Sequence, residues 1–231
     1  MSVLRNLLDA VQNNLISGDA YYIIAKGVIV TFMITIIAWI VAAGLGAVLS
    51  YFMAYEKKVL SAFFSAISFL CRSTPVLLLL LLMYYVVFKS INLNLVLLSG
   101  VTIGLYGAGH FSEIIARQVR KAKEVQDDIV IRRLQQVYFS VTLPQTMEDT
   151  LFMIKRLSIQ ILQWTTVVGY ITVNDLTEVM NRIGQRTMYP FFSIAVCIIC
   201  YLIATIVIET VFHMIHKKIK YISGQNENLP L

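Results

Sequence analysis

Two charged side chains stand in otherwise apolar parts of this sequence, and both could bind a small charged molecule. Arg72 lies in the segment Cys-Arg-Ser-Thr-Pro and is the only charged residue between Lys58 and Lys89. Asp175 follows a second apolar stretch, in a short polar segment. A guanidinium pairs with a carboxylate through two parallel hydrogen bonds, and an aspartate can pair with an ammonium group. The two residues could therefore bind a small molecule that carries both a carboxylate and an ammonium group.

Each of these residues also has a structural explanation. Arg72 could be neutralised within a helix bundle, because an unpaired arginine in hydrocarbon costs at least about 2.5–3.5 kcal/mol. Asp175 could cap a short helix over residues 176–182, since aspartate is a preferred N-cap residue. The two side chains could also pair with each other. These alternatives stay open from the sequence alone.

The cysteines and histidines could bind a metal or take part in catalysis, but their patterns in this sequence support neither role. Cys197 and Cys200 form a C-x-x-C pair inside an apolar run, where a thiol usually acts as a small apolar filler. His213 and His216 have no third ligand for zinc. His110 is interpreted as a packing residue. No nucleophile and general base can be recognised as a catalytic pair from their spacing in the sequence. We therefore expect no catalytic residue, no metal and no cofactor.

The composition is that of a membrane protein. The chain has 231 residues, of which 58% are hydrophobic and 14% charged. Residues 27–55 carry no charge, and about 20 such residues suffice for a transmembrane helix. An all-α membrane protein is expected, because the alternation of a β-barrel is absent. The five predicted spans are about Gly27–Ala54, Val59–Phe88, Leu93–Ile115, Thr150–Ile171 and Met188–Met214.

Basic residues predict the orientation of these spans. With the N-terminus outside, 13 of the 19 lysines and arginines lie in cytoplasmic segments and 5 lie outside. Cytoplasmic loops of membrane proteins carry such an excess, so the C-terminus is placed in the cytoplasm. The net charge of +6 then reflects membrane orientation and requires no nucleic acid. The predicted regions are an interfacial N-terminal segment (1–22), a transmembrane domain (23–219) and a cytoplasmic tail (220–231).

The second span is too long for a straight crossing. Its 30 residues would make a helix of roughly 45 Å, against a hydrocarbon core of about 30 Å. Pro75 lacks a backbone donor and disfavours helix at Thr74. We interpret residues 59–88 as one long crossing that is broken or kinked beside Arg72.

A charged cytoplasmic loop over about residues 117–149 interrupts the apolar spans. It holds 11 charged residues, yet apolar residues recur at helical spacing. The predicted helix would dock this apolar stripe against the bundle, present its polar face to a partner and end near Pro144. The stripe consists of Val130, Leu134, Val137, Tyr138 and Val141.

The end of this loop, Val141-Thr142-Leu143-Pro144-Gln145, resembles the end of the coupling loop in bacterial ABC-importer permeases, in the branch that takes up polar amino acids. The loop is degenerate, since Ile131 stands at the family's glycine position. The resemblance extends along most of the chain. Further segments that resemble family motifs are Arg72-Ser73-Thr74-Pro75, Phe111-Ser112-Glu113-Ile114, Gln126 with Asp128, Thr165-Thr166-Val167 and Asp175-Leu176-Thr177.

The resemblance implies a permease of the type I ABC-importer fold in the bacterial inner membrane. The chain has no phosphate-binding loop, so ATP hydrolysis is expected in a separate ATPase dimer. Further expected partners are a second permease subunit (identical or different), a substrate-binding protein, the amino acid and the lipid bilayer. An ion-gradient-driven secondary transporter or channel is the alternative. The expected coupling residues are Gln126, Asp127, Asp128, Leu143, Pro144 and Gln145, and the expected pathway residues are Arg72, Ser73, Thr74, Thr165, Thr166 and Asp175.

Overall fold

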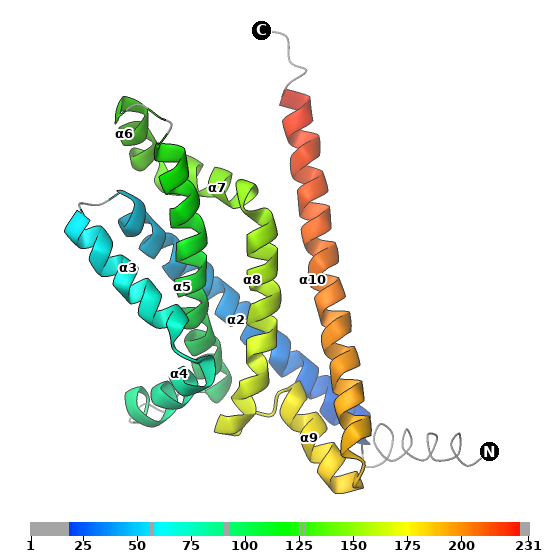
Figure 1. Ribbon diagram of the computed structural model, residues 1–231. Coiled ribbons are helices and arrows are strands. Elements are labelled where there is room, and N and C mark those ends of the chain that lie inside the picture. The colour runs from blue at the N-terminus through cyan, green and yellow to red at the C-terminus, as the bar shows by residue number, and fades with distance from the viewer. Residues whose placement is uncertain (1–18, 56–57, 90–92, 125, 127, 227–231) are drawn as a thin grey trace. The chain divides into compact units, whose positions relative to one another are not determined.

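The computed structural model describes residues 19–55, 58–89, 93–124, 126 and 128–226, and these residues are almost entirely helical (Figure 1). No strand occurs within these ranges. The expected all-α class is therefore confirmed. The elements in chain order are α2 (Ala20–Tyr55), α3 (Lys58–Ser73), α4 (Val76–Leu82), η3 (Met83–Val87), α5 (Leu95–Lys123), α6 (Asp128–Gln136), η4 (Tyr138–Thr142), α7 (Leu143–Asp149), α8 (Leu151–Trp164), η5 (Thr165–Ile171), α9 (Leu176–Thr187) and α10 (Pro190–Asn226).

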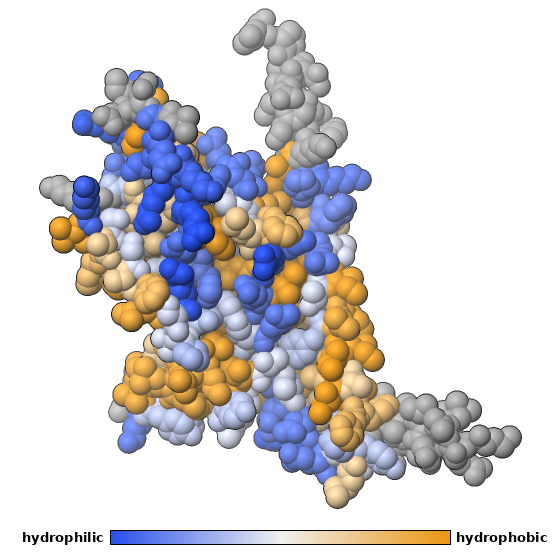
Figure 2. Space-filling model, viewed as in Figure 1, coloured by the Kyte–Doolittle hydropathy of each residue, from blue (hydrophilic) through white to orange (hydrophobic). Residues whose placement is uncertain are grey.

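Among the described residues, three helices are long and apolar enough to cross a membrane. They are α2, α5 and the stretch of α10 from Pro190 to Ile219. Exposed isoleucine, leucine and valine side chains run along α10, and Figure 2 shows hydrophobic surface over it. A helix that exposes so much apolar surface needs lipid or another apolar partner around it.

The helix pair α3 and α4–η3 provides a fourth span only if it is counted as one broken crossing. The two helices are bent by 101° at the break. The break falls at Thr74 and Pro75, because proline cannot donate to the preceding turn and disfavours helix before it. The sequence predicted the position of this break.

The predicted fourth span over residues 150–171 divides into α8 and the 3₁₀ helix η5. At 14 residues, α8 alone is about 21 Å long, short of the roughly 30 Å that a crossing requires. The count of five spans and their orientation therefore stay predictions. The predicted interfacial helix near the N-terminus lies outside the described residues, apart from the start of α2. Of the predicted tail, residues 220–226 continue α10, and residues 227–231 lie outside the described residues.

The chain divides into two compact units, whose boundaries fall within α2, α5, α8 and α10 and between α3 and α4. The first unit contains residues up to Ala38, Val76–Ile103 and Ile161–Ala204. Its core packs the start of α2 against α9, through Ala20, Val179 and Ile183 among others. The Thr31 hydroxyl accepts a hydrogen bond from the Leu176 amide at 3.0 Å, which holds the start of α9 on α2.

The second unit contains Trp39–Pro75, Gly104–Gln160 and the chain from Thr205. Helices α3 and α5 pack closely because Gly109 carries no side chain. A Cβ built there would lie 2.8 Å from the Ser68 carbonyl oxygen and 3.1 Å from the Arg72 nitrogen. The Ser68 hydroxyl donates to the Gly109 carbonyl at 3.0 Å. This close contact positions the end of α3, where Arg72 lies.

The charged loop forms two short helices and a π-helical turn, not one continuous helix. Helix α6 ends at Gln136, and Val137 leaves helical geometry at φ −103° and ψ 24°. The predicted apolar stripe is wrong: the change of helix type after Val137 shifts the register of the residues that follow, and Val130 in α6 is exposed as well. Tyr138 is buried, whereas Val130, Val137 and Val141 are exposed in this chain.

Candidate functional site

Arg72 lies in the last turn of α3, beside the carboxylate of Glu113 on α5. The Arg72 Nη2 atom is 3.9 Å from Glu113 Oε2, and the Arg72 side chain is 32% exposed. The guanidinium also lies over the ring of Phe69, with 5.5 Å from its central carbon to the ring centroid. Arg72 therefore has a partner carboxylate, as a charge in an apolar segment requires.

The pairing leaves Arg72 with unused hydrogen-bonding capacity. Within the described residues its Nε atom is buried without a hydrogen-bond partner. Glu113 is shared, because its other oxygen accepts a hydrogen bond from Arg117 at 3.0 Å. A guanidinium has five N–H donors in a fixed fork, and the 3.9 Å contact with Glu113 is too long for a hydrogen bond. The guanidinium therefore has N–H donors left with which it can bind a further carboxylate.

Ser73 and Thr74 lie with Arg72 where α3 ends. The Thr74 hydroxyl donates to the Leu70 carbonyl at 2.9 Å, and the Thr74 amide reaches the same oxygen at 3.3 Å. These bonds close the last turn of α3, which Pro75 cannot continue. The structure thus brings the three predicted pathway residues of this segment together at one helix end.

Asp175 is the N-cap residue of α9 and is fully buried. Its Oδ2 atom accepts from the Thr177 amide and its Oδ1 atom from the Glu178 amide, both at 3.1 Å. Thr172 at φ 63° is a left-handed residue that ends η5 and directs the chain into this cap. The capping alternative is therefore observed, while a role for Asp175 in a substrate pathway stays a prediction.

Thr165 is connected to Asp175 through Tyr201, but Thr166 is not. The Tyr201 hydroxyl lies 3.0 Å from the Thr177 hydroxyl and 3.4 Å from the Thr165 hydroxyl. Thr165 is fully buried and donates to a carbonyl of its own helical turn. Thr166 is exposed and bonds only within its own turn among the described contacts. The sequence therefore found two members of this polar network and missed Tyr201.

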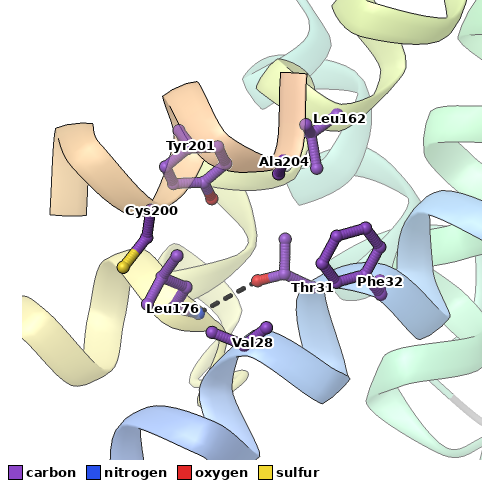
Figure 3. A pocket seen from close by; sticks show the side chains of 8 residues that line it. All are labelled: Val28, Thr31, Phe32, Leu162, Leu176, Cys200, Tyr201 and Ala204. Atoms are coloured by element: carbon purple, nitrogen blue, oxygen red, sulfur yellow. Dashed lines mark hydrogen bonds between the residues drawn. The ribbon is translucent and has the colours of Figure 1, made fainter. Parts of the chain in front are cut away.

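Figure 3 shows a small cavity beside this network, bordered by Thr31, Leu176, Cys200 and Tyr201 among others. Its volume is about 20 Å³. A single water needs roughly 10–15 Å³, so the cavity can hold a water but no amino acid. Cys200 lies against apolar neighbours here, and no group of three or more potential metal ligands occurs within the described ranges.

The predicted coupling residues fall at the two ends of the α6–η4–α7 segment. Gln126 is exposed in the turn before α6, Asp128 begins α6, and Asp127 lies outside the described residues. Leu143 begins α7, and Pro144 occupies its first turn, where a missing N–H costs nothing. Pro144 and Gln145 are exposed. Ile131 stands within α6, and the turn comes six residues later at Val137.

The segment is anchored to the end of α2 by Tyr138. The Tyr138 and Ser50 hydroxyl oxygens are 2.6 Å apart and buried. Burial raises the pKa of Tyr138 to about 12, so the phenol stays protonated at physiological pH. Arg120 and Lys123 of α5 donate to the Met53 and Ala54 carbonyls of α2 at 3.1 and 2.7 Å. These bonds satisfy carbonyls that a helix end leaves unpaired.

Comparison with known proteins identifies the family of the chain. Residues 46–221 match the family described as binding-protein-dependent transport system inner membrane component. Among solved structures, an amino acid ABC transporter crystallised with histidines has a TM-score of 0.69 and 17% identity, over 89% of this chain and 98% of that chain. The MetNI methionine ABC transporter in inward-facing conformations also has a TM-score of 0.69 and 17% identity, over 88% of this chain and 99% of that one. A search of curated proteins gave no significant match.

The structural likeness at this identity shows a shared fold, which is that of type I ABC-importer permeases. The family match covers well over half of the chain and extends from the last ten residues of α2 to residue 221 in the last part of α10. It includes Arg72, Glu113, Asp175 and the whole α6–η4–α7 segment. The resemblance drawn from the sequence motifs is therefore confirmed. The chain belongs to the binding-protein-dependent transport system inner membrane components.

Proposed function

We propose that this chain is the permease subunit of an ATP-driven importer that moves polar or charged amino acids across the bacterial inner membrane. Five spans with the N-terminus outside and the C-terminus in the cytoplasm suit this role. Three apolar helices and the broken α3–α4 pair account for four of them. The fifth is α8 with η5, whose 14 and 7 residues give about 21 and 14 Å at their usual rises.

The observation that carries the proposal is the incomplete pairing of Arg72. Its guanidinium has one long contact with a shared carboxylate and, in the part of the chain that the structure describes, one buried donor without a partner. The α-carboxylate of an amino acid supplies two oxygens in the geometry that such a fork binds. Glu113 then serves as the resident partner when no cargo is bound, and Arg117 retains Glu113 when the cargo arrives.

Ser73 and Thr74 are proposed to line the pathway with Arg72. Thr165, Thr166 and Asp175 are proposed to border the part of the pathway that passes the ammonium group or the polar side chain. Direct contact of the fully buried Asp175 with the cargo would require the amide bonds of its cap to open, so we propose that Asp175 acts there by holding the start of α9. We therefore assign the carboxylate-binding role to Arg72 first, and treat Asp175 as the weaker pathway candidate.

The ATPase dimer is proposed to bind the surface between Gln126 and Gln145. The exposed Pro144 and Gln145 at the start of α7, and the exposed valines of this segment, offer a mixed polar and apolar contact. The Tyr138–Ser50 bond and the basic caps on α2 give such a contact a rigid connection to the span. A second permease subunit and a substrate-binding protein, the latter on the outer face near residues 172–186, complete the proposed assembly.

Copurification and coupling test this proposal together. The tagged chain, expressed in its native host and purified, should capture an ATPase subunit, whereas an ion-driven transporter or channel would not. Replacing Asp127 and Asp128 with lysine should abolish uptake while leaving membrane insertion intact. The matched control replaces Lys217 and Lys218 with glutamine and should leave uptake unchanged. A chain that never captures an ATPase, or a lysine variant that transports normally within the complex, would refute the proposal.

A further inference from the structure

Helix α8 has an exposed polar face, although it belongs to the predicted fourth span. Arg156, Gln160 and Gln163 are all exposed. Positions three and four residues apart lie on the same side of an α-helix, so these side chains share one face of α8. The opposite face is buried and apolar at Ile154 and Ile161. The helix therefore divides into an apolar side that packs inside the protein and a polar side that does not.

Helix α10 shows what a surface suited to lipid looks like in this chain. Between residues 191 and 207, every exposed side chain of α10 is apolar. Ile198, Leu202 and Ile206 are each more than half exposed. Figure 2 shows hydrophilic surface over α8 and hydrophobic surface over α10. Because an amide or a guanidinium in hydrocarbon would lose its hydrogen bonds to water, the exposed face of α8 does not suit lipid.

An ion pair lies at the cytoplasmic end of α8. Glu209 is the only acidic residue of α10, and its Oε1 atom is 3.6 Å from Lys155 Nζ of α8. Both side chains are partly exposed, at 53% for Glu209 and 26% for Lys155. Charges in membrane segments usually face a water-filled cavity or the interior of the bundle. The partial exposure of this pair therefore indicates that water reaches α8 at this level.

We propose that the polar face of α8 lines a water-filled route and that Gln160 and Gln163 bind the polar side chain of the transported amino acid. This inference rests on the proposed function, in which α8 and η5 form one span. A glutamine amide has two N–H donors and an acceptor oxygen, so it pairs with hydroxyl, amide, carboxylate and ammonium groups. An apolar cargo would leave the two amides unpaired. The pair of glutamines thus selects polar amino acids of either charge.

Labelling with a charged thiol reagent tests whether water reaches the face. Q160C and Q163C are each introduced into the chain in native membranes, after its three cysteines have been replaced by serine. I198C and L202C on α10 are the matched controls. Because the thiolate is the reactive form and needs water to ionise, Q160C and Q163C should react at least about tenfold faster than the controls. Equal rates on the two helices, or no labelling on α8, would overturn the proposal.

Isothermal titration of the full-length chain in nanodiscs tests the contact with the cargo. The probes are glutamine, histidine, arginine and glutamate, with leucine as the apolar reference. Q160L/Q163L should raise the Kd of the polar probes that bind wild type by about tenfold, because two hydrogen bonds are lost, and should spare leucine. Q160N/Q163N keeps the amides and should recover part of the affinity. Equal Kd values for wild type and Q160L/Q163L, or a wild type that binds no polar probe, would remove the contact.

Three combined outcomes separate this inference from the function on which it rests. An ATPase that copurifies while Q160C stays unlabelled would overturn the inference and leave the importer standing. Fast labelling of Q160C in a chain that captures no ATPase would support the water-filled route and refute ATP-driven import. A disulfide between Q160C of two permease subunits, with labelling that saturating polar probes do not slow, would overturn the inference in favour of a subunit interface.

Discussion

The surroundings of Arg72 and Asp175 differ in how completely each charge is satisfied. The Asp175 carboxylate is fully buried, and both oxygens accept backbone hydrogen bonds at the start of α9. The Arg72 guanidinium is partly exposed, lies 3.9 Å from one shared carboxylate and keeps a buried donor without a partner within the described residues. The Asp175 carboxylate caps a helix, whereas the Arg72 guanidinium has hydrogen-bond donors left for a ligand.

The difference shows why Arg72 and Asp175 should not be assigned the same role, although both are charges next to apolar stretches of the sequence. A ligand at Asp175 would have to replace cap bonds that stabilise α9, at a cost of about 0.5–2 kcal/mol. A carboxylate at Arg72 adds hydrogen bonds to donors that are unused, and bonds to charged groups contribute about 1.5–3 kcal/mol each.

The largest effect is expected from replacing Arg72. R72A should lower amino acid uptake by about 100-fold or more, because two charge-assisted hydrogen bonds to the cargo are lost. R72K should fall between wild type and R72A, since it keeps the charge without the planar fork. Uptake of labelled amino acid by cells measures both. R72A with wild-type uptake would remove Arg72 from the pathway.

The next effect concerns the close packing that positions Arg72. G109A should destabilise the chain by about 1–3 kcal/mol, because the new methyl group would meet the backbone of α3 at 2.8 Å. Gly44 is the matched control, since a Cβ there meets nothing within 4 Å. G44A should leave thermal stability unchanged or slightly raised. Equal melting temperatures for G109A and G44A would show that α3 and α5 are less closely packed than described.

Replacing Asp175 should affect stability and leave substrate affinity intact. D175A should lower the stability of the folded chain by about 1 kcal/mol through loss of the cap. D175N should lose less, because asparagine also caps helices. Thermal unfolding is measured beside uptake per folded molecule. A D175N variant that melts like wild type but transports poorly would place Asp175 in the pathway.

The smallest effect is expected at the anchor of the α6–η4–α7 segment. S50A should cost about 1 kcal/mol, because it leaves the buried Tyr138 hydroxyl without its partner. With the pKa of Tyr138 raised to about 12, the folded state binds its proton more tightly than the unfolded state. The contribution of the protonated Tyr138 side chain to folding stability is thus complete below the ordinary tyrosine pKa of about 10. It is lost only as the pH rises towards 12. Unfolding measured from about pH 6 to about pH 9 should therefore show the same S50A effect throughout, whereas a pH-dependent difference would contradict the buried bond.

Local signals made part of the structure predictable. The break beside Arg72 follows from Pro75, and the cap of α9 follows from Asp175, because each residue constrains its own turn. The pairing of Arg72 with Glu113 could not be predicted, since the two lie 41 residues apart and meet only through the packing at Gly109. The predicted apolar stripe of the charged loop is wrong after Val137 because the π-helical turn changes the spacing on which the pattern depends. Its first residue, Val130, is exposed although it lies in α6 before that turn.

Direct ligand binding tests the central claim, the carboxylate-binding role of Arg72. Isothermal titration of the full-length chain in nanodiscs, with the common amino acids tested one at a time, removes the selection made by a binding protein. We predict that wild type binds at least one polar amino acid, that D175N binds it with the same affinity, and that R72A does not bind it. Binding of that amino acid by R72A with wild-type affinity, or its loss in D175N alone, would contradict the account.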